Sequence, residues 1–322
     1  MTLSPHLPGA TVHRVPIDGV ELVVETLGQG PAALLLHGFP HTRAIWRDVA
    51  PRLAAAGFRA IAPDLHGLGD STPAVRGYQA SAIATDLLRM LDVLGDREAH
   101  VVGTDLGVTP AFAVAASSPE RVTSLTLSEG LIGLLPGAEA FLRQGPPWWF
   151  GFHQAPGGLA EDVLENSADR YVRFFLSAGS RRGVPADLTR VIVEAYRGKT
   201  SLGNAFDHYR AMPATAEWIG NWAQDQRLTT PTLAIGGGVI GTATARQLEP
   251  ITGCLDQHLL EDCGHITPID QPDAFADLLI EHARAVMSSP LQDPSGTTPT
   301  EPTARGRGRL RREPHRLRTP RA

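Results

Sequence analysis

Short apolar segments alternate with amphipathic ones over about the first 130 residues of the chain. Residues 32–36 (AALLL) form an unbroken apolar run of strand length, and residues 80–94 repeat large apolar side chains at intervals of three and four. The first pattern is typical of a strand buried on both faces of a sheet, and the second of an amphipathic helix. Their alternation predicts a mostly parallel, doubly wound α/β sheet with helices on both faces.

The other elements follow from the same kind of pattern. Strands are predicted at residues 21–26, 58–64, 100–103, 122–127, 231–237 and 256–262. Helices are predicted at residues 44–56, 108–117 and 273–286.

The alternation stops after residue 131 and resumes near residue 219. Residues 132–218 lack short apolar strands, and their composition is typical of helices and loops. Ligands of open α/β sheets bind at the carboxyl ends of the strands, so an insertion at that edge covers the binding site. We therefore predict a helical lid at residues 132–218, inserted after the sixth strand, and one α/β core formed by residues 1–131 and 219–286.

The C-terminal segment, residues 287–322, differs in composition from the rest of the chain. It is rich in Pro, Thr and Arg, and its eight Arg against three acidic residues give it a net charge of +5. Because the whole chain carries −5, residues 1–286 carry −10. A segment with almost no large apolar side chains cannot offset the entropy of ordering, so we expect the tail to be disordered, with anion or RNA binding as the weaker alternative. The acidic body argues against a nucleic-acid-binding protein.

Other features narrow the class of protein further. No apolar run approaches the roughly 20 residues that a membrane span requires, and Met1–Ala10 lacks the features of a secretory signal. We therefore expect a cytoplasmic protein that does not bind membranes. Cys254 and Cys263 lack metal-binding spacing and are expected as free thiols rather than as a pair. No metal or other cofactor is predicted, and a homo-oligomer is compatible with the sequence.

The segment Gly103-Thr104-Asp105-Leu106-Gly107 joins a predicted strand to a predicted helix. Its G-x-D-x-G spacing matches the nucleophile elbow G-x-S-x-G, with Asp in place of Ser. Such a turn exposes the central side chain at the edge of the sheet, and the flanking glycines leave room for the neighbouring backbone. Asp105 is therefore the candidate nucleophile. The simpler alternative is an Asp that caps the following helix.

These residues resemble the α/β-hydrolase superfamily, in particular its branch with an Asp nucleophile, which comprises epoxide hydrolases and dehalogenases. The resemblance covers about residues 20–286. HGFP at residues 37–40 matches the oxyanion loop of the family, which implies an oxyanion hole made by the backbone N–H groups of Phe39 and Leu106. His265, after the last predicted strand, matches the position of the catalytic base. Alone it would be an ordinary loop or metal-binding histidine, but no second ligand lies at metal spacing.

In this family a third residue, an acid, orients the catalytic histidine and completes a triad with the nucleophile. The place of this acid in the sequence departs from the commonest arrangement of the family. It usually follows the strand predicted at residues 231–237, but residues 236–247 contain neither Asp nor Glu. The other arrangement of the family places the acid after the strand that follows the nucleophile helix, where Glu129 lies 24 residues beyond Asp105. This spacing resembles bacterial epoxide hydrolases with an Asp–Glu–His triad and implies that Glu129 orients His265. An exposed loop glutamate is the simpler alternative.

A carboxylate nucleophile restricts the reaction. Attack at carbon forms an alkyl ester that an activated water molecule hydrolyses, whereas attack on an ordinary ester would form an anhydride. The leaving group then decides the function. A halide requires N–H donors, and an epoxide oxygen requires an acid that can protonate it.

Two segments of the predicted lid resemble the parts of epoxide hydrolases that hold the epoxide oxygen. Asp207-His208-Tyr209-Arg210 resembles the segment with the ring-opening tyrosine, which implies that role for Tyr209. PWWFGFH at residues 147–153 matches the segment with the second donor, which implies Trp149, with Trp148 as a second donor or a pocket wall. Tryptophan is only a hydrogen-bond donor, and aromatic packing is the alternative for both. We expect His153 to be structural.

The sequence thus favours an epoxide hydrolase, a hydrolase of ether bonds that takes a small-molecule epoxide and water. Its aromatic lid favours a bulky, flat substrate. The general character of the chain resembles epoxide hydrolases of bacterial aromatic-polyketide pathways, a likeness that no single motif carries, and this implies natural-product biosynthesis.

Two other functions remain as hypotheses. A dehalogenase would use the same ester, but haloalkane enzymes commonly carry Trp where Leu106 stands, and fluoroacetate enzymes carry Arg at about the positions of Leu106 and Thr109. A non-catalytic ligand-binding member of the fold is the other hypothesis, although binding alone requires no complete triad.

Overall fold

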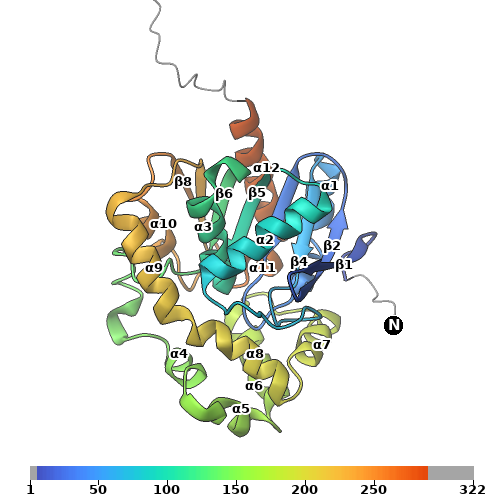
Figure 1. Ribbon diagram of the computed structural model, residues 1–322, viewed down its shortest axis with the longest axis vertical. Helices are drawn as coiled ribbons and strands as arrows, with labels where there is room; N and C mark the ends of the chain where they lie inside the picture. The colour runs from blue at the N-terminus through green and yellow to red at the C-terminus, as the bar shows by residue number, and fades with distance from the viewer. Residues whose placement is uncertain (1–5, 289–322) are drawn as a thin grey trace, which may run out of the picture. The chain divides into compact units, whose positions relative to one another are not determined.

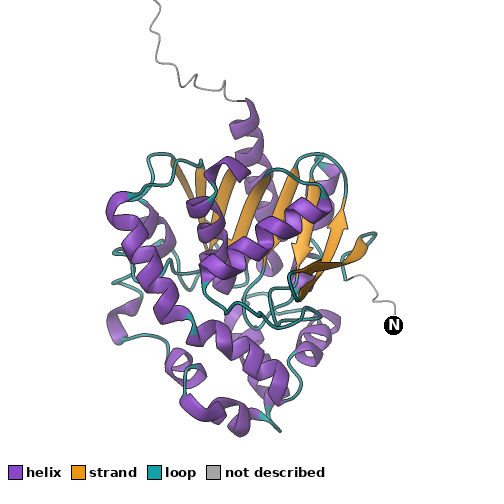
Figure 2. Ribbon diagram, in the orientation of Figure 1, coloured by secondary structure: helices purple, strands orange, loops and turns teal. Residues whose placement is uncertain are grey.

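An eight-stranded sheet forms the centre of the computed structural model, which describes residues 6–288 (Figures 1 and 2). The strand order is β1-β2-β4-β3-β5-β6-β7-β8; β2 pairs antiparallel with β1 and β4, and all other neighbours are parallel. The mostly parallel sheet predicted from the alternation is therefore confirmed. The strands are β1 (Thr11–Ile17), β2 (Val20–Leu27), β3 (Ala32–Leu36), β4 (Arg59–Pro63), β5 (Ala99–Thr104), β6 (Val122–Ser128), β7 (Thr232–Gly236) and β8 (Leu255–Leu259).

Strand β1 is the one strand that the apolar pattern did not predict. It lies at the edge of the sheet and pairs only with β2. Its sequence, TVHRVPI, carries polar side chains and Pro16, and most of its residues are at least partly exposed. A strand that is covered on one side only does not require an apolar run, and proline is tolerated at an edge.

Six helices of the core pack against the sheet: α1 (Ala50–Ala55), α2 (Ala80–Leu94), α3 (Val108–Ser117), α10 (Ala243–Leu248), α11 (Thr267–Asp270) and α12 (Pro272–Ser288). Helices α2 and α3 contact each other and lie in front of the sheet in Figure 1, whereas α12 lies behind it. The single helix predicted at residues 44–56 is instead a short 3₁₀ turn, Arg43–Trp46, followed by α1. Pro51 occupies the first turn of α1, where its missing N–H is tolerated, so a new helix begins there.

The segment between β6 and β7, which we call the lid, consists of helices and loops. Its helices are α4 (Trp148–His153), α5 (Leu159–Leu164), α6 (Ala168–Gly179), α7 (Ala186–Ala195), α8 (Lys199–Arg210) and α9 (Met212–Asp225). Figure 1 places most of them below the sheet, beyond the ends of its strands. Helix α9 continues to Asp225, so the predicted boundary at residue 218 falls inside a helix.

Helix α12 includes residues 287 and 288, which the sequence assigned to the tail, and the rest of that prediction lies outside the described residues. No helix within residues 6–288 has the length and apolar character needed to cross a membrane. Cys254 and Cys263 are both unpaired.

Candidate active site

Asp105 occupies a strained turn between β5 and α3. Its φ angle is 53°, in the left-handed region that non-glycine residues rarely adopt. The flanking glycines are required sterically, because a Cβ atom on Gly103 would lie 2.3 Å from the carbonyl oxygen of Gly107, and one on Gly107 would lie 2.5 Å from that of Leu36. The turn therefore has the geometry that the G-x-D-x-G spacing predicts.

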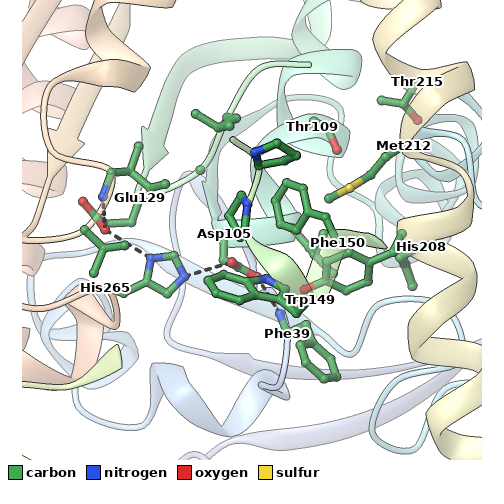
Figure 3. A pocket seen from close by; sticks show the side chains of 18 of the residues that line it. Phe39, Asp105, Thr109, Glu129, Trp149, Phe150, His208, Met212, Thr215 and His265 are labelled. Carbon is green, nitrogen blue, oxygen red and sulfur yellow. Dashed lines mark hydrogen bonds and ion pairs between the residues drawn. The ribbon is translucent and has the colours of Figure 1, made fainter. Parts of the chain in front are cut away.

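The two carboxylate oxygens of Asp105 have different partners (Figure 3). The backbone N–H of Phe39 donates to Oδ1 at 2.7 Å, and Nε2 of His265 lies 2.9 Å from Oδ2. Leu106 follows in the same turn and lines the same cavity, but within residues 6–288 no hydrogen bond joins its N–H to Asp105. One oxygen is thus held by the loop after β3, and the other faces the histidine.

Glu129 lies on the opposite side of His265 from Asp105 (Figure 3). Its Oε2 is 3.1 Å from Nδ1 of His265, and its side chain is fully buried. The carboxylate also accepts hydrogen bonds from the backbone N–H groups of Gly237 (2.6 Å), Ile240 (3.0 Å) and Gly241 (3.0 Å). The loop after β7, which lacks an acid of its own, therefore surrounds the carboxylate that follows β6.

The two carboxylates determine the charge state of His265. Burial alone would lower the pKa of its imidazole, but the hydrogen bonds and charges of Asp105 and Glu129 outweigh burial and raise that pKa to about 10. For the Asp105 carboxyl, burial alone would raise the pKa. The hydrogen bond and the charge of His265 outweigh burial, so the pKa of Asp105 is lowered from its usual value. At neutral pH the pair is therefore an imidazolium beside a carboxylate.

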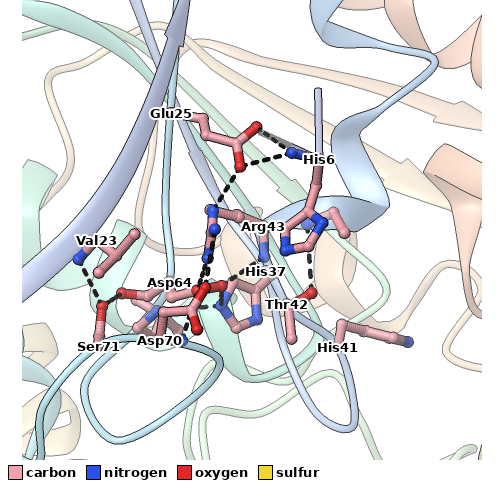
Figure 4. A network of polar contacts seen from close by, with 12 residues as sticks. His6, Val23, Glu25, His37, His41, Thr42, Arg43, Asp64, Asp70 and Ser71 are labelled. Atoms are coloured by element: carbon pink, nitrogen blue, oxygen red, sulfur yellow. Dashed lines mark hydrogen bonds and ion pairs between the residues drawn. The ribbon is translucent and has the colours of Figure 1, made fainter. Parts of the chain in front are cut away.

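A buried ionic network holds the loop that carries Phe39 (Figure 4). The guanidinium of Arg43 is fully buried and forms ion pairs with Glu25 of β2 (2.8 Å), with Asp64 after β4, and with Asp70 (2.9 Å). The N–H of Arg43 also donates to Asp64 at 2.8 Å. Sequence reasoning missed this network, although charged residues inside or directly after apolar strands were a signal for it.

A second buried carboxylate, Asp270, ties the His265 loop to the lid. It accepts hydrogen bonds from the backbone N–H groups of Gly264 (2.6 Å), Arg181 (2.9 Å) and Arg182 (3.2 Å), and from the Ser180 hydroxyl (2.5 Å). The N–H of His265 itself donates to the carbonyl of Gly179, at the end of α6, at 2.6 Å. The position of His265 is thus coupled to the connection between α6 and α7.

A cavity of about 510 Å³ lies above Asp105 and under the lid. Its walls are mostly apolar and aromatic, and both Tyr209 of α8 and Trp149 of α4 line it. Burial raises the pKa of the Tyr209 phenol well above its usual value, and the negative charge of Asp105 raises it further. Tyr209 is therefore a neutral phenol, and its hydroxyl forms no hydrogen bond with another residue of the described chain.

The structure separates the two tryptophans that the sequence placed together. The Trp148 side chain is 57% exposed and lines a separate hollow on the lid surface, so we withdraw it as a donor in the cavity. Successive side chains of a helix point about 100° apart, so only one of two neighbours can face the substrate. Their rings still contact each other, with centroids 5.8 Å apart.

His153 lies behind the cavity wall. It is fully buried, stacks on Phe206 at 4.1 Å, and pairs with the Tyr171 hydroxyl at 2.6 Å. These contacts are those of a packing residue. Within residues 6–288 no group of three or more His, Cys, Asp or Glu side chains is arranged to hold a metal ion.

The chain is similar to a family of known proteins. Residues 31–272, three quarters of the chain, match the model of the α/β-hydrolase fold. The chain is 29% identical to the soluble epoxide hydrolase of Corynebacterium sp. (strain C12), covering 84% of this chain and 96% of that protein. It is 31% identical to epoxide hydrolase 2 of Siraitia grosvenorii, covering 65% and 75%. It is 27% identical to bifunctional epoxide hydrolase 2 of Sus scrofa, with 89% of this chain matched but only 58% of that longer protein.

A solved structure agrees at the level of the fold. The ligand-free epoxide hydrolase CorEH superimposes with a TM-score of 0.77 at 24% identity, over 86% of this chain and 99% of that one. The chain therefore belongs to the α/β-hydrolase family and, within it, to the group that contains these epoxide hydrolases.

Proposed function

We propose that this protein is an epoxide hydrolase that opens an organic epoxide through an ester on Asp105. The observation that carries the proposal is the set of partners around Asp105. One oxygen is held by the Phe39 N–H and the other faces His265, beneath a cavity that also contains a neutral phenol, Tyr209. The names of the relatives support the same activity.

In the first step, Oδ2 of Asp105 attacks a ring carbon of the epoxide. The carbon–oxygen bond of the ring breaks as the ester bond forms, and Tyr209 donates its proton to the departing oxygen. Trp149, which is a donor only, can stabilise that oxygen with its N–H but cannot release a proton to it. Oδ1 becomes the carbonyl oxygen of the ester and remains beside the Phe39 N–H.

Formation of the ester changes the role of His265. Esterification removes the negative charge of Asp105, one of the two groups that raise the pKa of His265. The imidazolium then becomes more acidic, and its proton can restore the Tyr209 phenol. Charge-coupled pKa changes of this kind convert an acid into a base without a conformational change.

In the second step, neutral His265 accepts a proton from water while the water oxygen attacks the carbonyl carbon of the ester. Negative charge develops on Oδ1, to which the N–H of Phe39 donates. The N–H of Leu106, which forms no hydrogen bond to Asp105 within residues 6–288, is the second proposed donor. The ester bond breaks, and the diol oxygen takes the proton from His265. Asp105 is left as a carboxylic acid and returns its proton to His265, which restores the imidazolium–carboxylate pair. Glu129 holds Nδ1 of His265 and stabilises the transient imidazolium.

The shape of the cavity favours a bulky, flat substrate. Aromatic side chains from the loop after β3 and from the lid line it, including Phe39, Trp149, Phe150 and Phe175. Flat rings stack well on such walls. A setting in natural-product biosynthesis stays a prediction.

A product analysis tests this function. Purified protein is incubated with aryl epoxides and, in parallel, with chloroalkanes and bromoalkanes of similar size. Diol formation without halide release is expected, because Tyr209 can protonate an oxygen leaving group. Efficient halide release with no diol from any epoxide would replace the proposal with a dehalogenase, in which the Trp149 N–H binds the halide.

A further inference from the structure

The cavity has a second polar end, away from the triad. In Figure 3, Glu129 and His265 lie on one side of Asp105, and His208, Met212 and Thr215 lie on the other. His208 belongs to α8 and Thr215 to α9, and both line the cavity. The proposed chemistry uses neither residue.

Thr215 is already engaged in the fold. Its Oγ1 accepts a hydrogen bond from the N–H of Ala80, the first residue of α2, at 3.1 Å. A free N–H at a helix start requires such an acceptor. Thr215 therefore has a sufficient structural role.

His208 has one satisfied ring nitrogen and one unsatisfied. Its Nε2 lies 2.9 Å from the carbonyl oxygen of His66. A carbonyl oxygen only accepts, so Nε2 carries the proton and donates it. Nδ1 of a neutral imidazole then carries a lone pair and is an acceptor.

Nδ1 of His208 can accept a hydrogen bond only while the imidazole is neutral. Burial lowers the pKa of the imidazole to about 3, although the contact with the His66 carbonyl raises it in part. The ring is therefore neutral at any pH near 7. The ring of Tyr78 packs edge-on against it, with centroids 4.8 Å apart, and holds its orientation.

Nδ1 of His208 differs from other unpartnered histidine nitrogens of the described chain. Five ring nitrogens of four other histidines are buried in the protein without a partner: Nδ1 and Nε2 of His41, Nδ1 of His66, Nε2 of His100 and Nδ1 of His153. Nδ1 of His208 also has no partner within residues 6–288, but it is not among these buried atoms, and its ring lines the cavity. It is thus an acceptor that is open to a bound molecule.

We propose that His208 forms a polar subsite that accepts a hydrogen bond from a hydroxyl group of the substrate, at the end of the molecule remote from the epoxide. This rests on the proposed function and narrows its substrate class to bulky epoxides with a distal hydroxyl. A methyl group or a carbonyl oxygen at that position leaves Nδ1 unsatisfied. A buried acceptor without a donor costs binding energy, so the subsite selects for the hydroxyl.

Two matched substrates test the subsite. One is a naphthyl glycidyl ether with a hydroxyl group on its far ring, and the other has a methyl group there. We expect kcat/KM for the hydroxylated ether to exceed that for the methylated ether by roughly threefold to tenfold, as one net hydrogen bond predicts. In His208→Leu the ratio should fall to about one, because leucine cannot accept. In His208→Gln the ratio should largely return, because the amide keeps both a donor for His66 and an acceptor.

A purely structural role of His208 gives a different result. Loss of the contact with the His66 carbonyl would lower kcat/KM for both ethers equally and leave their ratio unchanged. Met212→Leu, an apolar change on the same side of the cavity, serves as the matched control and should keep the wild-type ratio. No preference in the wild-type protein, or an unchanged ratio in His208→Leu, overturns the proposal.

Failure of the subsite can be separated from failure of the proposed function. If neither these ethers nor any of the aryl epoxides tested above gives a diol, the epoxide-hydrolase proposal fails. Calorimetric binding of the two corresponding diols then still tests His208. Tighter binding of the hydroxylated diol, lost in His208→Leu, supports the subsite, and equal binding of the two diols overturns it.

Discussion

The two sides of Asp105 are built differently. On the side of the sheet, Phe39, His265 and Glu129 form a continuous set of hydrogen bonds with Asp105, each between 2.7 and 3.1 Å. On the side of the lid, Tyr209 and Trp149 line the cavity without a hydrogen bond to Asp105. The groups proposed for ester hydrolysis are thus in contact before substrate arrives, whereas the groups proposed for the leaving oxygen have their polar atoms free for it.

This difference agrees with the demands of the two proposed steps. Water must be activated at a defined carbon atom, which favours a rigid base. The leaving oxygen arrives with each substrate. Tyr209 and Trp149 therefore need to lie near the place that this oxygen will occupy, but they need no hydrogen-bond partner in the free protein. Substitutions on each side should therefore slow different steps of the reaction.

Glu129→Gln should impair the sheet side most strongly. The amide cannot stabilise the His265 imidazolium, and loss of the corresponding acid in a related triad lowers kcat by about 10⁴-fold. Because the ester-forming step needs only Asp105 and the donors of the lid, the ester should still form and should accumulate. Rapid-quench mass spectrometry measures both steps. Equal slowing of ester formation and hydrolysis would contradict a role restricted to the base.

Tyr209→Phe should impair the lid side instead. Removal of one donor to a developing oxyanion typically lowers the rate about 10²-fold. We expect slow ester formation, no accumulated ester, and an unchanged melting temperature, because the hydroxyl forms no hydrogen bond within the described chain. Wild-type rates of ester formation would remove Tyr209 from the mechanism.

The two tryptophans offer a matched pair on the lid. Trp149→Phe retains the aromatic wall and removes only the N–H, so we expect a loss of roughly tenfold in ester formation, less than for the proton donor. Trp148→Phe should leave the rate unchanged, because this side chain faces the lid surface. A larger effect for Trp148 than for Trp149 would show that the lid rearranges when substrate binds.

The pKa of His265 provides a test without substrate. In the wild-type protein, NMR titration with isotope-labelled histidine should give a pKa near 10, and Asp105→Asn should lower it by removing one of the two charges that raise it. The pKa of His265 in the folded protein lies above its value of about 6.5 in the unfolded chain. The interaction of the imidazolium with the two carboxylates therefore stabilises the fold fully at pH values below about 6.5. The contribution is lost as pH rises toward 10. A pKa unaffected by Asp105→Asn would contradict the proposed switch from acid to base.

The sequence predicted the sheet side of the site better than the lid side, for a physical reason. The strands and the elbow follow from local patterns of apolar residues and glycine. The pairing of Glu129 with His265 was implied by the resemblance to the family, which places each of these residues after its strand. In the lid, no local sequence pattern determines which side chains face the cavity. Whether Trp148 or Trp149 faces the substrate depends on the phase of a six-residue helix, which neighbouring helices determine.

Other features required the folded chain. The loop at Gly237–Gly241 donates to Glu129 across more than 100 residues of sequence, and Asp270 joins two loops about 90 residues apart. Such contacts cannot be predicted from the sequence, because almost every residue type carries a backbone N–H. The acceptor of His208 is similar, because only the contact with the His66 carbonyl shows which nitrogen carries the proton.

The most direct test of the proposed ester is its capture in His265→Gln. Without the base the ester should form and persist, so incubation with a substrate epoxide should add the full mass of that epoxide to the peptide that contains Asp105. The double variant Asp105→Asn/His265→Gln should show no adduct. For the wild-type protein, a single turnover in heavy-oxygen water should place the label in the Asp105 carboxylate and not in the diol. Absence of any adduct, together with label that enters the diol in the first turnover, would contradict the account and indicate direct attack by water.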